Sequence, residues 1–388
     1  TWNVSGAWNA HEEKFFSNLT SVLSHFTLKA SYSLTADRGP ADVTNSQAII
    51  TSYSPYRPFT SIQESGLYIK ELENSELTYE KKHELNIGAD MGFLNNRINL
   101  AVDWYKRNNY DLIGIVNTQG AGGQILKYAN IASMKSHGIE FTLSTKNIKT
   151  KDFNWNTDFI FSNAKNEVTD LKQNANVMEL ISGNGFAKQG YPVRGLFSIP
   201  FVGLDKDGIP VIINEKGEAT STDINFQERQ NTGFLKYEGP TDPTITGSLG
   251  NMFSYKGFRL NLFITYSFGN VIRLNPVFKA YYSDLTAMTR EFKNRWTLPG
   301  DEAKTNVPAI LSKRMYDSNE DLKYAYNAYN YSTERIAKGD FIRLKEISLA
   351  YDFPKAWINP LKLTDLSLKV QATNLFLIYA DDKLNGQD

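Results

Sequence analysis

Three consecutive stretches decide the fold: Leu85-Asn86-Ile87-Gly88-Ala89-Asp90-Met91-Gly92-Phe93, then Leu94-Asn95-Asn96-Arg97, then Ile98-Asn99-Leu100-Ala101-Val102-Asp103-Trp104. In the first and third stretches every second residue is apolar, and most residues between them are polar or small. A period of two gives a β-strand one apolar face and one polar face. The four residues in the middle are enough for a tight hairpin turn and little else. The stretch therefore predicts two antiparallel strands that share an apolar face.

The same alternation recurs on both sides of this hairpin. It predicts ten strands, near residues 1–9, 26–37, 77–93, 97–113, 133–147, 153–169, 243–255, 257–269, 341–354 and 363–379. No segment of similar length has an apolar stripe of helical period, although residues 11–25 and 280–296 could form short helices.

The connections between these strands alternate between tight turns and long excursions. The long ones cover residues 38–76, 114–132, 171–241 and 270–340. Short turns at one end of the strands and long loops at the other are typical of outer-membrane β-barrels. Loops of this length would be unusual in a compact soluble domain.

The composition excludes several classes of protein. The chain has 388 residues, 42 basic and 42 acidic side chains, four histidines and no cysteine. A formal charge of zero gives no sign of nucleic-acid binding. The absence of cysteine excludes disulfides, a thiolate zinc site and a cysteine nucleophile. No apolar run approaches the roughly 18 residues of a membrane-spanning helix, whereas the alternating strands of a membrane barrel would not produce such a run.

The apolar face could instead belong to the core of a soluble β-sandwich or solenoid. The polar faces are rich in Asn, Ser, Thr, Asp and Lys, as a water-filled lumen requires. Sandwich strands recur every 8–12 residues or so, and solenoid repeats every 20–50 or so, and neither spacing is found here. Aromatic residues at the expected strand ends indicate interfacial girdles; they are Trp8, Tyr32, Tyr79, Trp104, Tyr105, Trp155, Tyr266 and Tyr351.

Motifs for catalysis are absent from the sequence. There is no G-x-S-x-G elbow, no phosphate-binding P-loop and no H-E-x-x-H pair. Gly120-Ala121-Gly122-Gly123 is interpreted as a flexible loop. Asp205-Lys206-Asp207-Gly208 is interpreted as a hairpin turn rather than the start of a calcium loop. The sequence therefore predicts no enzyme, no catalytic residue, no metal site and no cofactor.

Several motifs together resemble the SusC/RagA class of TonB-dependent outer-membrane transporters. They occur in family order along nearly the whole chain: Trp2–Trp8, Leu77–Lys81, Leu85–Asp90, Gly92–Leu100, Val102–Lys106, Lys135–Glu140, Arg295–Asp301, Phe341–Leu349 and Ala372–Phe376. The resemblance is specific to the family rather than to one member.

The resemblance implies an all-β fold, a transmembrane antiparallel β-barrel with long extracellular loops. The family barrel has 22 strands and an N-terminal plug, and this chain resembles strands 12 to 21. Residues 1–388 are therefore expected to form the C-terminal part of the barrel, with the plug and the final strand outside the chain. Ten strands alone would leave two edges unpaired in lipid, so we expect the rest of the barrel as further sequence or as a separate chain.

The resemblance also implies energised import of large nutrients, oligosaccharides or peptides, across a Gram-negative outer membrane. The implied partners are a SusD-like surface lipoprotein that forms a lid, TonB acting through the absent plug, and membrane lipid, with no nucleic acid. Aromatic residues of the longest loop are candidate substrate contacts: Tyr281, Tyr282, Trp296, Tyr326, Tyr329 and Tyr331. Packing within the loop or binding to the lid is the stronger interpretation of these residues.

Three other functions stay open at this point. A passive porin would lack a plug, and a siderophore-type TonB-dependent receptor would lack a lipoprotein partner. An outer-membrane barrel enzyme would need a nucleophile and a base at the lumen rim, with only four histidines to draw on.

Overall fold

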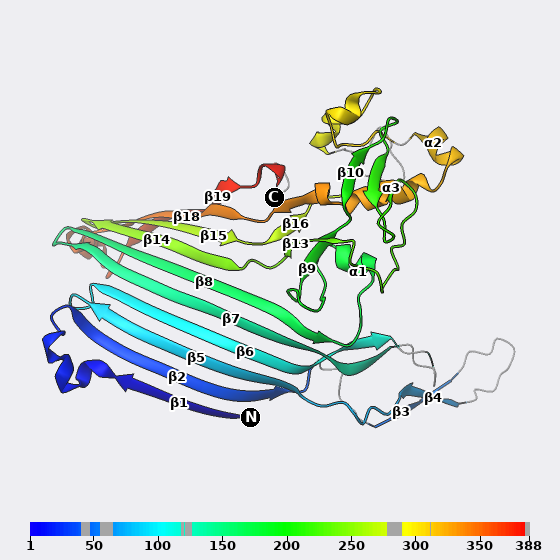
Figure 1. Cartoon of the computed structure of the whole chain (residues 1–388). Coiled ribbons are helices and arrows are strands. Elements are labelled where there is room, and N and C mark those ends of the chain that lie inside the picture. Colours follow the sequence, from blue (N-terminus) through cyan, green and yellow to red (C-terminus); the bar gives the residue numbers. More distant parts are fainter. Residues whose placement is uncertain are drawn as a thin grey trace.

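The fold is a single antiparallel sheet of ten strands that follow one another in chain order (Figure 1). The computed structural model describes residues 1–39, 47–54, 65–117, 120, 126–277, 289–310 and 312–384. The strands of the sheet are β1 (Trp2–Asn9), β2 (Leu23–Asp37), β5 (Glu80–Phe93), β6 (Ile98–Asn117), β7 (Leu126–Lys149), β8 (Phe153–Leu171), β14 (Ile245–Tyr255), β15 (Phe258–Phe268), β18 (Phe341–Asp352) and β19 (Ser367–Ala380). The ten strands predicted from the alternation are confirmed.

The largest difference from the predicted boundaries lies in β6 and β7, which extend further toward the long loops than expected. Register shifts interrupt their pairing between Asn109 and Leu112, and Asp111 has a positive φ of 58°. A bulge of this kind breaks the period of two, so the alternation could not show that pairing continues beyond it. A contact with the segment before β5 stabilises this extension: the side-chain amide of Asn130 donates to the Thr78 carbonyl oxygen at 2.9 Å.

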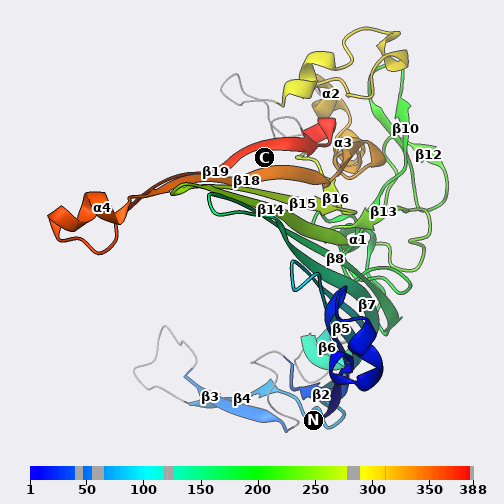
Figure 2. The same ribbon diagram turned by 90° about the vertical axis from the view of Figure 1, so that its left-hand side faces the viewer.

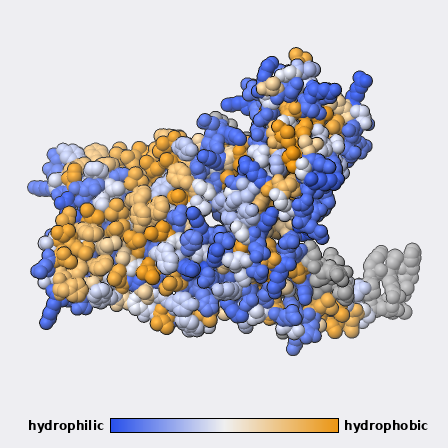
Figure 3. Space-filling view, in the orientation of Figure 1, coloured by the Kyte–Doolittle hydropathy of each residue, from blue (hydrophilic) through white to orange (hydrophobic). Residues whose placement is uncertain are grey.

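The sheet is bent into an arc, and its two faces differ in chemistry. Figure 2 shows the strands curving from β1 around to β19. Paired positions place Ile87, Trp104 and Ile139 side by side on one face, and Gly88, Asp103 and Glu140 on the other. Figure 3 looks onto the convex side of the arc, where apolar side chains cover a broad band of the sheet. The apolar stripes therefore lie on the convex face, and the polar stripes line the concave face.

Two tight turns fix the register at the short-loop end. Leu94, Asn95 and Asn96 all have positive φ angles, between 51° and 59°, and the Arg97 amide donates to the Phe93 carbonyl oxygen at 3.0 Å. The turn between β14 and β15 is shorter, with φ of 45° at Lys256 and 91° at Gly257. Positive φ at both central residues gives the turn a twist that matches the strands.

Large aromatic rings pack over glycines that lie opposite them. On the concave face Tyr105 pairs with Gly138, where a β-carbon would come within 2.6 Å of the tyrosine ring. On the convex face Tyr266 pairs with Gly247 and its hydroxyl donates to the Ile160 carbonyl oxygen at 2.9 Å. A ring that covers a cross-strand glycine restores the contact surface that the glycine lacks.

Aromatic side chains form two rows on the convex face. Toward the long loops Tyr32 lies 5.5 Å from Trp2 between ring centroids and 6.1 Å from His83, which in turn lies 5.9 Å from Tyr110. Toward the short turns Trp155 lies 5.6 Å from Phe253 between ring centroids, and Phe258 lies 4.4 Å from Tyr351. Two rows with an apolar band between them are the arrangement expected of interfacial girdles.

One of the predicted girdle residues is placed differently. Tyr105 lies on the concave face and is buried there. The reason is the alternation itself, because Tyr105 directly follows the outward-facing Trp104 and must point to the opposite side.

Helices are short and lie in the connections. Residues 11–25, where a short helix was considered, contain two 3-10 segments, η1 (Ala10–Glu12) and η2 (Lys14–Asn18). The connection from β18 to β19 contains α4 (Lys355–Ile358) and η7 (Asn359–Leu361). In the part of the chain that the structure describes, no helix is long and apolar enough to cross a membrane.

The opposite chemistry of the two faces predicts opposite responses to a new charge on β15. Leu262 lies on the convex face and Asn261 on the concave face. A lysine at Leu262 is expected to destabilise the assembled barrel by roughly 2–4 kcal/mol if the site lies near the bilayer midplane, whereas Asn261→Lys should be tolerated. The measurement is the folded fraction of each full-length variant in outer membranes, from its heat-dependent migration in gels. Equal folded fractions for the two variants would contradict the face assignment.

Candidate functional site

The concave face carries a network of charged and polar side chains. Lys29 on β2 forms an ion pair with Asp90 on β5 at 2.6 Å, and the Ser144 hydroxyl donates to the Asp158 carboxylate at 2.6 Å. A cavity of about 410 Å³ opens on this face near β1 and β2. It is lined by Ser5, Gly6, Ala7, Lys29, Ala30, Ser31, Asn86 and Asp103. This face can bind water and polar solutes through both hydrogen-bond donors and acceptors.

The two longest connections fold together at the other end of the sheet. They form what we call the loop subdomain, the described residues of 172–244 and 269–340 (Figure 1). Its elements are α1 (Val177–Ile181), β9 (Gly195–Ser198), β10 (Phe201–Leu204), β11 (Pro210–Ile213), β12 (Ala219–Thr220), β13 (Lys236–Pro240), β16 (Val271–Arg273), η4 (Arg290–Asn294), η5 (Asp301–Ala303), α2 (Lys313–Ser318), α3 (Leu322–Asn330), η6 (Thr333–Arg335) and β17 (Ile336–Lys338). Of residues 280–296, where a second short helix was considered, the described part contains only the 3-10 segment η4.

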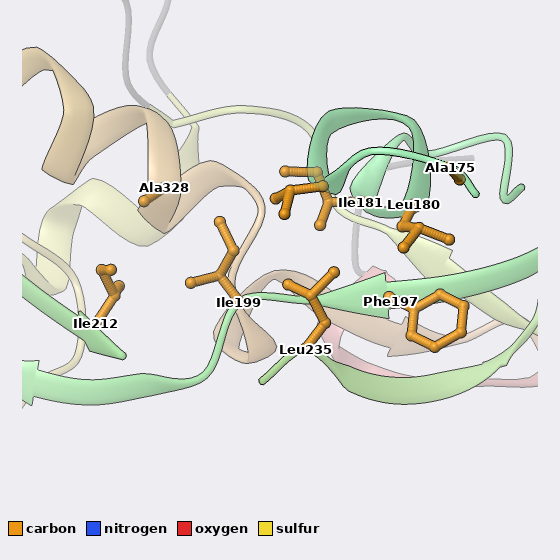
Figure 4. Packing of buried hydrophobic residues seen from close by; sticks show 9 residues of the cluster. Ala175, Leu180, Ile181, Phe197, Ile199, Ile212, Leu235 and Ala328 are labelled. Atoms are coloured by element: carbon orange, nitrogen blue, oxygen red, sulfur yellow. The ribbon is translucent and has the colours of Figure 1, made fainter. Parts of the chain in front are cut away.

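An apolar core holds the loop subdomain together. Leu180 and Ile181 of α1 point toward Ile199, Leu235 and Phe197 on neighbouring segments (Figure 4). The short helix is fixed by a capping box, in which the side chain of Asn176 accepts from the Glu179 amide and the Glu179 carboxylate accepts in return. These long connections are therefore packed structure with their own core.

A buried ion pair holds together distant parts of the second connection, residues 269–340. Arg335 is 1% exposed, and its guanidinium contacts the Glu291 carboxylate at 2.6 Å and donates to the Asn275 carbonyl oxygen at 2.6 Å. It also lies 6.0 Å from the centre of the Tyr329 ring. Burial raises the pKa of the Tyr329 hydroxyl well above its usual range, so this tyrosine stays neutral.

A second buried guanidinium joins β16 to β9. Arg273 donates to the Phe197 carbonyl oxygen at 2.6 Å and to the Ser332 carbonyl oxygen at 3.2 Å. Burial lowers the pKa of Arg273 to about 10, which still leaves it charged at neutral pH. The two arginines thus bond carbonyl oxygens from separate segments through charge-assisted hydrogen bonds.

A second cavity, of about 480 Å³, lies between the extended β6–β7 hairpin and α1. Most of its wall is aliphatic, including Leu112, Ile115 and Ile131. The polar part contains Arg229 and Glu179, whose nearest side-chain atoms are 3.4 Å apart. This volume and lining fall within the range of small-ligand pockets, and the charged pair could orient a ligand with a polar end.

The aromatic residues predicted as substrate contacts are separated by the structure. Tyr281 and Tyr282 lie outside the described residues. Tyr326 and Tyr329 are each 2% exposed, and the Tyr326 hydroxyl donates to the Ala309 carbonyl oxygen at 2.8 Å. Neither ring has a face open to a ligand, so both tyrosines stabilise the loop subdomain in this structure.

Trp296 and Tyr331 are half-buried. Tyr331 lies beneath the Arg273 guanidinium, which is 5.7 Å from the ring centre. The Trp296 ring covers Gly208, and its indole N–H donates to the Glu302 carboxylate at 2.9 Å.

Two loop motifs of the sequence have structural roles. Asp205 closes a hairpin turn by accepting from the Asp207 and Ile209 amides, at 2.9 Å each, which confirms the predicted turn. Asp301 accepts hydrogen bonds from the backbone of Leu298 and from the hydroxyl and backbone of Thr297, and these lower its pKa to about 2. Within the described ranges, no three His, Asp or Glu side chains are grouped to hold a metal ion.

The sequence did not predict the charged contacts of the loop subdomain, because each is made by single charged residues of polar loops. Arg273, Glu291 and Arg335 come from separate segments, and so do Glu179 and Arg229. No spacing rule links them, because they meet only after the connections have folded. The one local signal was the capping box at Asn176 and Glu179.

Curated proteins with similar sequences are TonB-dependent receptors. Receptor P3 of Formosa agariphila is 24% identical over 95% of this chain, and receptor P39 of the same organism is 26% identical over 95%. The TonB-dependent receptor SusC of Bacteroides thetaiotaomicron is 24% identical over 90%. The chain spans 36%, 38% and 34% of the length of these three relatives, in that order. No family model matches the sequence.

Solved structures share the fold. The RagAB peptide transporter aligns with a TM-score of 0.75 and 23% identity, covering 97% of this chain and 39% of that chain. The open-open state of the RagAB peptide importer gives the same TM-score. These comparisons confirm the resemblance to SusC/RagA-type TonB-dependent transporters, the partial β-barrel fold and the outer-membrane location.

The buried ion pair predicts a large effect of a single substitution. Arg335→Ala leaves the Glu291 carboxylate without its partner and should destabilise the loop subdomain by about 3–5 kcal/mol. The matched control is Arg194→Ala, because Arg194 pairs with Asp242 at 2.6 Å but is 48% exposed, where such a pair contributes about 1 kcal/mol or less. The measurement is the rate of protease cleavage within residues 172–340 of the full-length protein. Similar cleavage rates for both variants would show that the buried pair does not hold the subdomain.

Proposed function

We propose that this chain forms part of the wall and the outer rim of a TonB-dependent importer for large nutrients, oligosaccharides or peptides. The observation that carries the proposal is the pairing of an apolar convex face with a charged concave face over ten strands. Similarity to TonB-dependent receptors over 90–98% of the chain supports the same function. The concave face would line the passage, and the loop subdomain would stand over its outer opening.

We further propose that residues 1–388 are the C-terminal portion of the barrel and that other strands close it. Within the described chain, β1 and β19 each pair on one side only. Lipid does not tolerate an unpaired strand edge, so both edges need further strands. The plug through which TonB would act would then fill the lumen against the concave face.

A SusD-like lipoprotein is the proposed partner at the outer end. The hairpin of β3 (Ile49–Tyr53) and β4 (Gly66–Glu71) extends from this end and carries exposed apolar side chains. Ile50 is 63% exposed and Leu67 is 76% exposed. Apolar side chains gathered at an exposed site indicate a surface for a protein partner.

The cavity between the β6–β7 hairpin and α1 is a second candidate for substrate contact, besides the aromatic residues of the longest loop. Its aliphatic wall and its Glu179–Arg229 pair offer both apolar and charged contacts. Tyr281, Tyr282, Trp296 and Tyr331 stay candidates for the same role. The proposed activity is transport without catalysis, in keeping with relatives that are receptors and transporters.

The proposal predicts that uptake depends on TonB. Deletion of the encoding gene should abolish growth on the imported oligosaccharide or peptide mixture as sole carbon source, and inactivation of TonB should do the same. The measurement is growth of isogenic strains on each mixture, with free monosaccharides and amino acids as the control. Uptake that continues without TonB would favour a passive porin.

Purification of the full-length protein from native membranes tests the partner. We expect a lipoprotein to co-purify at a one-to-one ratio, and Leu67→Asp on the exposed hairpin should weaken this association relative to Thr51→Asp on the paired strand. A receptor that purifies alone and restores growth on ferric siderophores would favour the siderophore-type alternative.

A further inference from the structure

A row of basic side chains crosses the convex face near the loop subdomain. Lys106 on β6 lies directly opposite His137 on β7, and His137 lies directly opposite Lys165 on β8. The register is unbroken through these pairs, so the three side chains share one face. Two strand spacings separate the outer members, or about 10 Å. All three side chains are exposed.

The neighbouring charges on this face have partners, whereas the two lysines of the row do not. Lys135 pairs with Glu167 at 3.0 Å, and Lys81 pairs with Asp111 at 2.8 Å. Neither Lys106 nor Lys165 forms an ion pair with any residue that the structure describes. Basic groups aligned across adjacent strands repel one another when both carry charge. The described part of the chain therefore supplies no anion to neutralise these two lysines, and an anion from outside it could do so.

The height of the row on the sheet indicates where this anion comes from. The next row toward the bilayer contains Trp104 and Ile139, two exposed apolar side chains that lie directly opposite each other. The basic row thus borders the apolar band at its long-loop edge. Lysines at such an edge extend their ends to the headgroup layer, where lipids carry phosphate.

At the opposite edge of the convex face, paired strand positions carry neutral groups. Outward positions near the short turns include Trp155 and Asn251, joined by a hydrogen bond of 2.9 Å, and Asn147 and Thr157, joined by one of 2.7 Å. Phe253 and Tyr255 follow on β14. Exposed lysines at this end, such as Lys149, Lys151 and Lys256, lie at the end of β7 or in turns and not in a row across paired strands.

We propose that Lys106, His137 and Lys165 form a binding site for the phosphate groups of lipid A in the outer leaflet. Long loops face the cell exterior in barrels of this type, so the basic edge lies in the leaflet that contains this phosphorylated glycolipid. The two ammonium groups and the imidazole supply hydrogen-bond donors to phosphate oxygens. The acyl chains would lie along Trp104, Ile139 and the apolar band below them. This site concerns the outer surface of the barrel and is independent of what passes through the lumen.

The test is the amount of lipid A that stays bound to the full-length transporter purified from native outer membranes, measured by mass spectrometry. In Lys106→Gln/Lys165→Gln the affinity for lipid A should fall roughly thirtyfold, because each lysine near an anionic lipid surface contributes about a factor of five. The control Lys149→Gln/Lys151→Gln removes the same charge from exposed lysines at the short-turn end and should retain wild-type binding.

Two further measurements identify the ligand and test the proposal even if the Gln variant folds poorly. Lys106→Arg/Lys165→Arg preserves the charge and should retain lipid A. In reconstitution, the wild type should prefer phosphorylated lipid A to dephosphorylated lipid A and to phosphatidylglycerol. Equal lipid A retention by the Gln variant and its control would overturn the proposal, and so would equal binding of the phosphorylated and dephosphorylated forms. Preference for phosphatidylglycerol would overturn the assignment to lipid A.

Discussion

Backbone hydrogen bonding in an apolar solvent is the constraint on which the rest of this structure depends. Within lipid each backbone N–H and C=O must find its partner inside the protein, because no water is available. The ten strands satisfy this requirement through continuous antiparallel pairing in chain order, from β1 to β19. The requirement also explains the tight turns at one end, since each returns the chain directly to its neighbouring strand. Side chains are then free to differ between the faces, apolar toward lipid and charged toward the lumen.

The loop subdomain is stabilised in a different way from the barrel wall, because it is expected to lie in water beyond the membrane. There the apolar residues of Figure 4 form an interior, and polar groups that lie within it need internal partners. Arg335 and Arg273 fill this role by bonding a carboxylate and several carbonyl oxygens from separate segments. The barrel wall thus depends on regular pairing, whereas the loop subdomain depends on a few buried contacts between distant residues.

This contrast explains how much the sequence could predict. The strands were predictable because alternation such as Leu85 to Phe93 is a local signal, and the register confirms the faces it implies. The loop subdomain was not predictable, because its helices and strands are short and are held by contacts such as Arg335 with Glu291. Tyr105 was placed in the girdle by residue type, although its position in the alternation puts it on the concave face. Tyr326 and Tyr329 were candidates by residue type, and only the fold shows that they are buried.

The central claim is that the two faces of the sheet meet different solvents, lipid outside and water inside. These 388 residues contain no cysteine, so single cysteines can be introduced along β15 and spin-labelled in the full-length protein after any cysteine elsewhere in it has been replaced. Collision with oxygen, which concentrates in lipid, should be high at Leu260, Leu262 and Ile264, and collision with a water-soluble nickel complex should be high at Asn261, Phe263 and Thr265. An accessibility profile with a clear period of two is the predicted result. A profile without that period, or with the two sets reversed, would contradict the account.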